Sequence, residues 1–450
     1  MIEGAELPPE RALPPPDPES RRRLVARAVI LAAAFFLTLV LISPGCRGLP
    51  RDEDVPLAAF PGPVANAPHV RVLVRGSAPA VTLAVAGPFR MFDGRGAEIP
   101  HRNEKLSRLP VTFQDGRLAL GAFALVISGE PISRLRIAPE RLGSLEVDGK
   151  VYPGDVEFIG VKGASALHAV VHMAIEEYVA GVLAGEVPVE SWHDEALRAQ
   201  AVVSRSYALY FALKNAREPW DFGTTGREAQ EYRAGIVRNA RINRAVNLTA
   251  GEVLVFGNQV FPAYFHSSCG GHTVDAAEVF TRQSIPPLAG AECPWCTKQP
   301  ENKYASWKKE FSIGTLAYRL RRAAENNPAL KTVAKLGDIR SVEAAAASPD
   351  GRITRFLVRG PFAPGSLELS ANDFRGAVGW SDLPSTKCRM TASGSRYTFA
   401  GSGWGHGVGL CQWGSQGMAL AGYGYQEVLA SYFPMSRLVR MTYAAAGPGA

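Results

Sequence analysis

The sequence lacks a cluster of basic residues dense enough for nucleic-acid binding, although its formal net charge is +7 over 450 residues. A protein that binds nucleic acid concentrates lysine and arginine on one face or in a short run. Here the charged residues, 20% of the chain, are spread along it. A nucleic-acid partner is therefore not expected.

Two common nucleotide-binding motifs are also missing from the most glycine-rich stretch, Gly401–Gly409. Counted from Gly401, the sixth position of a G-x-G-x-x-G pattern is His406, and no Gly-Lys-Ser/Thr follows as a P-loop requires. Glycines instead alternate around Trp404 and His406. This spacing lets a backbone approach a ligand closely while tryptophan offers a flat face to a sugar ring. The alternative is a glycine-rich turn with a core tryptophan and histidine.

Long apolar runs are scarce, and the one near the amino end, Ala28–Ile42, is short for a membrane-spanning helix. Its length is typical of a signal-peptide core, and four arginines just before it place the amino end in the cytoplasm. Cys46 follows small residues as in a lipoprotein cleavage site. We expect the body to lie outside the cytoplasm, tethered to the membrane either by Ala28–Ile42 or by lipidated Cys46.

The composition indicates a folded, turn-rich chain: 46% of residues are hydrophobic, with 45 glycines and 33 prolines. Short alternating apolar runs between 69 and 170 predict strands. The expected fold class is α+β, β-rich with a central pair of helices and a glycine-rich C-terminal motif. The expected division is a disordered cytoplasmic tail (1–20), a signal peptide or anchor (21–46), a linker (47–68), a β-rich domain (69–170), a second domain (171–434) with a β-rich insert at about 304–385, and a C-terminal tail (435–450).

The central helices are predicted from the stretch 175–211. Apolar residues recur at helical spacing from Ile175 to Leu183, Gly185 suits the left-handed residue that ends a helix, and Pro188 prevents its continuation. Ser191 and Asp194 form a potential capping box for a second helix. The inner face of that helix would carry Leu197, Ala201, Ser204, Ala208 and Phe211.

Glu186 lies where the first of these helices is expected to end. The negative end of the helix dipole and partial burial both raise a carboxyl pKa, and a carboxylic acid that keeps its proton near neutral pH suits general-acid catalysis. The alternative is structural: Glu186 caps the next helix or pairs with Arg198 or Arg205.

Cysteine and histidine gather between residues 266 and 296. Cys269 and His272, together with the C-x-x-C pair Cys293 and Cys296, form a reasonable structural zinc set. Disulfides among these cysteines are the competing interpretation for a chain outside the cytoplasm, with Cys388 and Cys411 as the remaining pair. A third interpretation assigns His266 and His272 to a sugar ligand and leaves only the cysteines structural.

Three separated motifs resemble the SpoIID/LytB family of bacterial cell-wall proteins. They are EEYVAGVLAGEVP with EALRAQAVVSRSYAL, then YFHSSCGGHT at Tyr264–Thr273, and GSGWGHGVGLCQWGSQGMA at Gly401–Ala419, and the resemblance covers about Val70–Pro434. It implies a lytic transglycosylase that acts on peptidoglycan glycan strands stripped of stem peptides, with a cell-wall amidase as partner. Some members bind a metal at positions that align with Gly223, Glu228 and Ala229; this chain lacks those ligands.

The resemblance also implies residue roles. Glu186 would be the single catalytic acid and base, and no cofactor would be required for the chemistry. The residues expected to orient the sugar or to hold Glu186 are His266, Ser267, Ser268, Thr273, Trp404, His406, Gln200 and Arg205.

Two other functions fit the same sequence. One is a LytB-like enhancer, a non-catalytic protein that stimulates a peptidoglycan amidase. The other is a zinc hydrolase built on the cysteine–histidine cluster.

Overall fold

The computed structural model describes residues 57–60, 68–102, 104–127, 130–140, 144–223, 230–235, 239–280 and 283–441. The expected N-terminal tail (1–20), the apolar run Ala28–Ile42 and Cys46 lie outside these ranges. No helix within them is long and apolar enough to cross a membrane.

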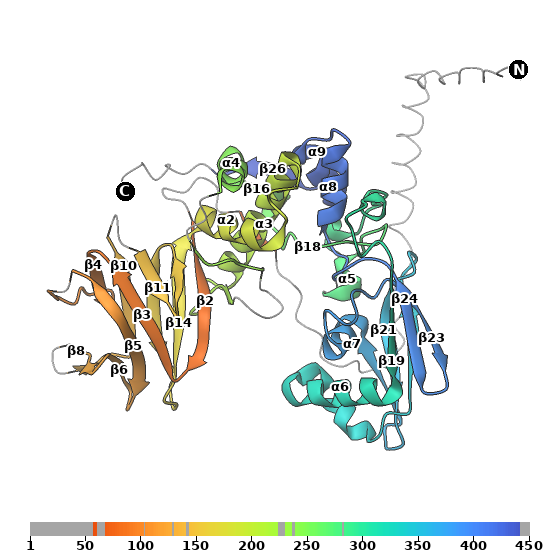
Figure 1. Ribbon diagram of the computed structural model, residues 1–450, viewed down its shortest axis with the longest axis horizontal. Helices are drawn as coiled ribbons and strands as arrows, with labels where there is room; N and C mark the ends of the chain where they lie inside the picture. The colour runs from red at the N-terminus through yellow and green to blue at the C-terminus, as the bar shows by residue number, and fades with distance from the viewer. Residues whose placement is uncertain are drawn as a thin grey trace, which may run out of the picture. The chain divides into compact units, whose positions relative to one another are not determined.

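Two six-stranded sheets form the first part of the described chain (Figure 1). The first has the order β15-β2-β14-β13-β10-β4, and the second has the order β12-β11-β3-β5-β6-β7. Their strands are β2 (His69–Ala78), β3 (Ala80–Ala86), β4 (Phe89–Asp93), β5 (Leu106–Gln114), β6 (Arg117–Leu120), β7 (Phe123–Ala124), β10 (Arg134–Pro139), β11 (Ser144–Val147), β12 (Lys150–Tyr152), β13 (Asp155–Gly160), β14 (Leu167–Ala174) and β15 (Phe222–Gly223). A short pair, β8 (Val126–Ile127) and β9 (Glu130–Pro131), lies beside them in sequence.

Alternate residues of both sheets point into one shared core, as the period of a strand requires. Val70 and Val72 of β2 and Leu83 of β3 are buried in the same cluster. The sheets approach so closely that a Cβ on Gly160 would lie 2.2 Å from the ring of Phe113. Strand β14 then runs directly into a helix and so connects this sandwich to the centre of the chain.

The central helices are α2 (Ile175–Glu186) and α3 (Asp194–Lys214). Every residue of the predicted inner face of α3 is buried, which confirms the interpretation of its pattern. The helix ends differ from expectation. Gly185 lies inside α2 rather than in a left-handed cap, since the helix continues to Glu186. A Cβ at Gly185 would lie 2.6 Å from the carbonyl oxygen of Glu231, so this close approach requires a glycine. The N-cap of α3 is His193, not Ser191.

A four-stranded sheet packs against α3, with the order β1-β17-β16-β26. It draws on distant parts of the sequence, including residues 58 and 59 of the expected linker. The elements of this region are β1 (Ala58–Ala59), α4 (Ala240–Leu248), β16 (Glu252–Phe256), β17 (Gln259–Val260), β18 (Phe265–His266), α5 (Ala276–Val279) and β26 (Arg437–Arg440), with 3-10 turns η1 (Pro286–Leu288) and η2 (Cys296–Lys298).

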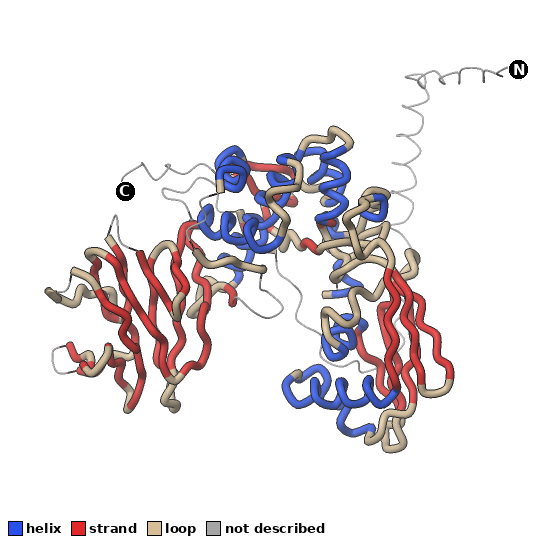
Figure 2. Tube along the Cα trace, in the orientation of Figure 1, coloured by secondary structure: helices blue, strands red, loops and turns tan. Residues whose placement is uncertain are grey.

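A separate core follows, built on two three-stranded sheets and two helices (Figure 2). Its elements are β19 (Trp307–Ser312), α6 (Ile313–Asn326), the 3-10 turn η3 (Pro328–Leu336), β20 (Ser341–Ala347), β21 (Ile353–Arg359), β22 (Ser366–Ser370), α7 (Ala371–Val378), β23 (Cys388–Ser393) and β24 (Arg396–Gly401). The chain then returns through β25 (Leu410–Cys411), which pairs with β18, to α8 (Gln412–Leu420) and α9 (Tyr425–Tyr432). The α+β, β-rich fold class is thus confirmed.

Arg205 fixes the start of α2 against the rest of the central region. Its guanidinium is fully buried and binds both carboxylate oxygens of Glu176, at 2.6 Å and 2.9 Å, and the carbonyl oxygen of Glu252. Glu176 also accepts a hydrogen bond from the backbone N–H of Gly251. A buried charge needs such partners, since it has lost its hydration. Arg205 therefore has a structural role and does not hold Glu186, contrary to expectation.

Replacing Arg205 with alanine should lower the free energy of unfolding by about 3–5 kcal/mol, because Glu176 would lose the cation that it pairs with. Chemical denaturation monitored by circular dichroism measures this. Arg90→Ala is the matched control, since its pair with Glu98 has side chains about half exposed (51% and 49%) and should contribute little. Equal losses in both variants would contradict the prediction.

Candidate active site

Glu186 is the last residue of α2, and its carboxylate is held at both oxygens. The backbone N–H of Glu231 donates to Oε1 at 2.6 Å, and the side-chain amide of Gln412 donates to Oε2 at 3.5 Å. Neither structural alternative from the sequence is present: Arg198 binds Glu195, and Arg205 binds Glu176.

Burial raises the pKa of Glu186 to about 7, and the hydrogen bonds from Glu231 and Gln412 oppose this shift. The balance follows from the position of the side chain. Desolvation disfavours the carboxylate form, and two neutral donors do not compensate for it as a paired cation would. At neutral pH the group is therefore present in comparable amounts as acid and as base.

The carboxylate lines an open cleft of about 630 Å³. One wall is the connector 187–191 after α2, and the other is made of Arg233, Ala234, Gly235, Asn239 and Ile242.

Two residues of the second wall region hold the connector in place. Arg241 donates to the backbone carbonyls of Val189 and Trp192 and pairs with Asp194 at 2.6 Å. Asn239 donates its side-chain amide to Glu190 at 2.6 Å. The short segment between the two helices is therefore fixed by α4, and Glu186 is presented on a rigid edge.

Gln200 contributes to the site through Gln412. Its carbonyl oxygen accepts from the Gln412 amide at 3.4 Å, while its own amide donates to Ser204. Because the same Gln412 amide also reaches Glu186, Gln200 orients the donor rather than the acid. The expected link between Gln200 and Glu186 is therefore indirect.

The two motif histidines pack against each other beside β25, with ring centroids 5.3 Å apart. His266 is buried, and its Nδ1 bonds to the carbonyl oxygen of Val408. Its pKa is lowered to about 3, mainly because of burial and also because of the positive charge of Arg352. Burial and His266 likewise lower the pKa of His406. Both rings are therefore neutral, and neither lines the cleft that contains Glu186.

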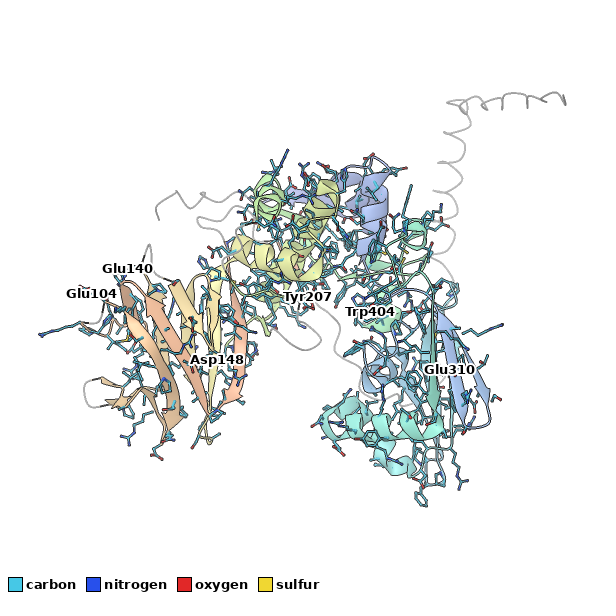
Figure 3. The ribbon with its side chains drawn as sticks, in the orientation of Figure 1. Glu104, Glu140, Asp148, Tyr207, Glu310 and Trp404 are labelled. Carbon is cyan, nitrogen blue, oxygen red and sulfur yellow. The ribbon has the colours of Figure 1, made fainter. Side chains whose placement is uncertain are left out.

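The remaining motif residues make contacts within the protein. Ser268 is fully buried, and its backbone pairs with that of Trp404 at 2.8 Å and 3.0 Å. Trp404 lies in the loop after β24 (Figure 3), with its ring 4.1 Å from that of Tyr304. The Thr273 hydroxyl bonds to the backbone of Ala291. None of these residues, nor Ser267, lines the cleft of Glu186.

The alternating glycines bring the C-terminal motif against the earlier one. At Gly405 a Cβ would lie 2.7 Å from that of His266, and at Gly409 it would lie 2.1 Å from the carbonyl oxygen of Tyr264. Both positions have positive φ, which glycine adopts without strain. The close approach predicted from the spacing is therefore between two protein segments.

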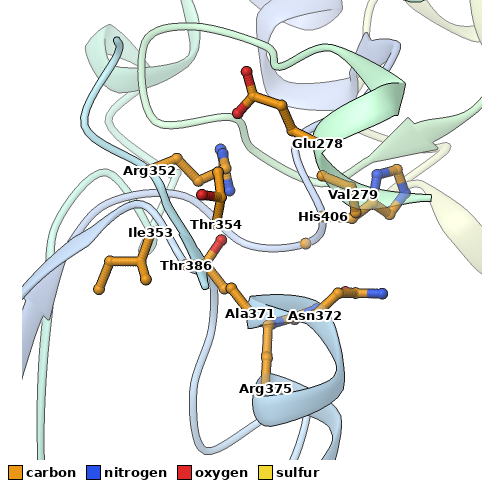
Figure 4. A pocket seen from close by; sticks show the side chains of 11 residues that line it. Glu278, Val279, Arg352, Ile353, Thr354, Ala371, Asn372, Arg375, Thr386 and His406 are labelled. Atoms are coloured by element: carbon orange, nitrogen blue, oxygen red, sulfur yellow. The ribbon is translucent and has the colours of Figure 1, made fainter. Parts of the chain in front are cut away.

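His406 lines a small cavity that is separate from the cleft of Glu186 (Figure 4). Figure 4 shows Arg352 and Arg375 with Glu278 around it. Arg375 is buried and donates to the carbonyl oxygen of Leu383. The space is too small for a sugar, and it does not include Glu186.

Four cysteines meet nearby. The Sγ atoms of Cys269, Cys293, Cys296 and Cys411 all lie within 4.8 Å of one another, and all four side chains are buried. His272 of the predicted set is outside this group, and its Nδ1 bonds to the backbone of Thr273. Cys411 takes its place. The expected pair of Cys388 with Cys411 is therefore wrong, and Cys388 is a free buried thiol on β23.

Sequence reasoning missed the partners of Glu186. The donor at residue 231 is a backbone N–H, which has no sequence signal. Gln412 lies 226 residues from Glu186, and only the fold brings them together.

The comparisons with known proteins agree with the motifs. Residues 164–256 match the SpoIID family model, described as Stage II sporulation protein, and residues 296–409 match a domain of unknown function (DUF8618). The first match contains Glu186, Gln200 and Glu231, but not Gln412.

Three relatives are similar over most of the chain. An uncharacterized protein of Brachyspira hyodysenteriae is 28% identical over 370 residues, which cover 82% of this chain and 92% of that protein. The amidase enhancer of Bacillus subtilis is 27% identical over 68% of this chain, and the match spans 46% of its own length. Stage II sporulation protein D of Bacillus amyloliquefaciens is 27% identical, with 59% of this chain and 74% of that protein covered.

The raised pKa of Glu186 predicts a specific pH dependence of stability. An ordinary glutamate titrates at 4.5 and this one at about 7, so between these values the folded state binds more protons than the unfolded state and stability falls as pH rises. Glu186→Gln removes this loss, so the difference between its free energy of unfolding and that of the parent should grow from pH 4.5 to pH 8. At pH 8 the variant should be more stable by about 1–3 kcal/mol. Thermal unfolding of both proteins across that range tests it, and parallel curves would contradict it.

Proposed function

The chain belongs to the SpoIID/LytB family, and we propose that it is an extracytoplasmic lytic transglycosylase. Its substrate is denuded peptidoglycan, and it cleaves the bond between N-acetylmuramic acid and N-acetylglucosamine. The observation that carries this proposal is the Glu186 carboxyl, with a pKa of about 7, on the edge of an open cleft. The names of the relatives support a cell-wall role.

In this mechanism Glu186 acts twice. Its protonated form gives a proton to the glycosidic oxygen as the bond to C1 breaks. The carboxylate that remains then accepts the proton of the muramic acid 6-hydroxyl as that oxygen attacks C1, which closes a 1,6-anhydro ring. Water takes no part, and the enzyme returns to its starting state.

A single cycling acid suits this site better than a pair of carboxylates. Glycoside hydrolysis generally uses two, one on each side of the bond. Glu190 also lines the cleft, but it is exposed and bound to Asn239. Glu186 is the buried one of the two, and its pKa is raised because its desolvation is not offset by a cation.

The Gln412 amide and the Glu231 N–H hold the carboxylate in the direction that the reaction needs. Both are neutral donors, so they stabilise the carboxylate without removing its basicity. A positioned acid–base group of this kind typically contributes about 10²–10⁴-fold to the rate. The rest of the acceleration comes from the orientation of the glycan in the cleft.

A non-catalytic role is the second candidate, because one relative is an amidase enhancer. In that case the cleft binds glycan, and a peptidoglycan amidase is the partner. A hydrolase built on the cysteine–histidine cluster is not favoured, because the four thiols are fully enclosed and leave no position open to a substrate.

We also propose that the chain is tethered to the membrane, either by Ala28–Ile42 or by lipidated Cys46.

The test is digestion of denuded glycan strands by the parent and by Glu186→Gln. We expect the parent to release fragments that end in 1,6-anhydro-muramic acid, detected by mass spectrometry. The amide variant should be at least 10²-fold slower, because it can neither give nor take the proton.

Glu177→Gln is the matched control, since it lies on the same helix but is exposed near its start. It should cleave at the parent's rate. If the parent does not cleave but stimulates an amidase, the enhancer role replaces the enzyme. If Glu186→Gln cleaves as fast as the parent, Glu186 is not the catalytic acid.

A further inference from the structure

We propose that Cys269, Cys293, Cys296 and Cys411, here called the thiolate cluster, hold one structural Zn²⁺. The four residues come from three separate segments, and each is buried. Two of them form the C-x-x-C pair, which gives two thiolates on one turn, and the others come from the loop after β18 and from β25. Such a set is typical of closed tetrahedral zinc sites.

The spacing of the sulfurs fits a metal and not a disulfide. Cys269 and Cys296 Sγ atoms are 3.5 Å apart, and all four fall within 4.8 Å. Zinc–sulfur bonds of about 2.3 Å place the corners of a tetrahedron about 3.8 Å apart. A disulfide requires about 2.05 Å. Four sulfurs that share one centre match the metal geometry.

Hydrogen-bond donors surround the sulfurs as they do in metal thiolate sites. The backbone N–H groups of Cys269 and Gly414 donate to Cys411 Sγ at 3.2 Å and 3.3 Å, and the Tyr432 hydroxyl donates to Cys293 Sγ at 3.0 Å. Thiolates are better acceptors than thiols, and such donors orient the ligands. At Gly414 a Cβ would lie 2.5 Å from Cys293 Sγ, so glycine is needed there.

A buried cation beside the cluster provides a second, independent indication. The Arg352 side chain is almost fully buried (1% exposed), and its Nη2 donates to the carbonyl oxygen of Cys269 at 2.9 Å. Its Nε and Nη1 have no partner within the described part of the chain. A buried guanidinium needs nearby negative charge. Four thiolates around Zn²⁺ carry a net charge of −2, which adds to the negative charge that Asp350 and Glu278 already place near this guanidinium.

The cluster also connects two parts of the molecule. Cys293 and Cys296 lie where the chain enters the region that matches DUF8618, and Cys411 lies just after that region ends. Cys411 is also the N-cap of α8, whose first residue is Gln412. The metal thus holds together the two ends of the region that matches DUF8618. Through α8 it also fixes the Gln412 amide, which reaches Glu186. This consequence, but not the metal site itself, rests on the proposed function.

The experiment uses the purified full-length chain and elemental analysis. We expect about one zinc per chain in the parent and in Cys388→Ser, which removes a buried thiol outside the cluster. Cys293→Ser and Cys296→Ser should lose most of the metal, and chelation should lower the thermal midpoint of the parent. Cobalt exchanged into the parent should give the visible absorption of tetrahedral thiolate coordination, a readout that does not depend on activity.

Three results would overturn the proposal. One is a metal-free parent whose cluster cysteines resist alkylation until they are reduced, which would show disulfides. Another is a metal-free parent with four free thiols. The third is stoichiometric iron, which would overturn the assignment of the ion. None of these depends on glycan cleavage, so a failure here is distinct from a failure of the proposed function.

Discussion

The site depends on a balance of desolvation against hydrogen bonding at one carboxyl group. Glu186 ends α2 at the edge of a cleft, where burial favours the acid form and two neutral donors favour the carboxylate. If a cation such as Arg205 reached Glu186, the pKa would fall and the group would be a permanent base. The fold instead pairs Arg205 with Glu176 at the opposite end of the helix.

Much of the surrounding structure keeps that carboxyl in place. Strand β14 of the sandwich leads directly into α2, and Arg241 binds the connector after it. Gln412, the first residue of α8, contacts Glu186 although it lies 226 residues away in the sequence. The segments that were expected to touch substrate, around His266 and Trp404, pack on each other and on the cysteine cluster. Their glycines and small side chains allow the close approach that this junction requires.

Local features were predictable because local physics decides them. The apolar stripe of α2, the inner face of α3, and the alternating strands between 69 and 170 all have the expected form. The position of Glu186 at a helix end also followed from its neighbours. The exact caps did not, since α2 continues through Gly185 to Glu186, and His193 rather than Ser191 caps α3.

The sequence by itself predicted the β-rich α+β class, the resemblance to the SpoIID/LytB family and the place of Glu186 at a helix end. Only the tertiary structure decided what surrounds that acid, that Arg205 is structural, and that Cys411 rather than His272 joins the other cysteines. The physical reason is sequence separation. Periodicity and capping act over a few residues, whereas Gln412 and Glu186 meet across 226 residues through packing that no local pattern encodes.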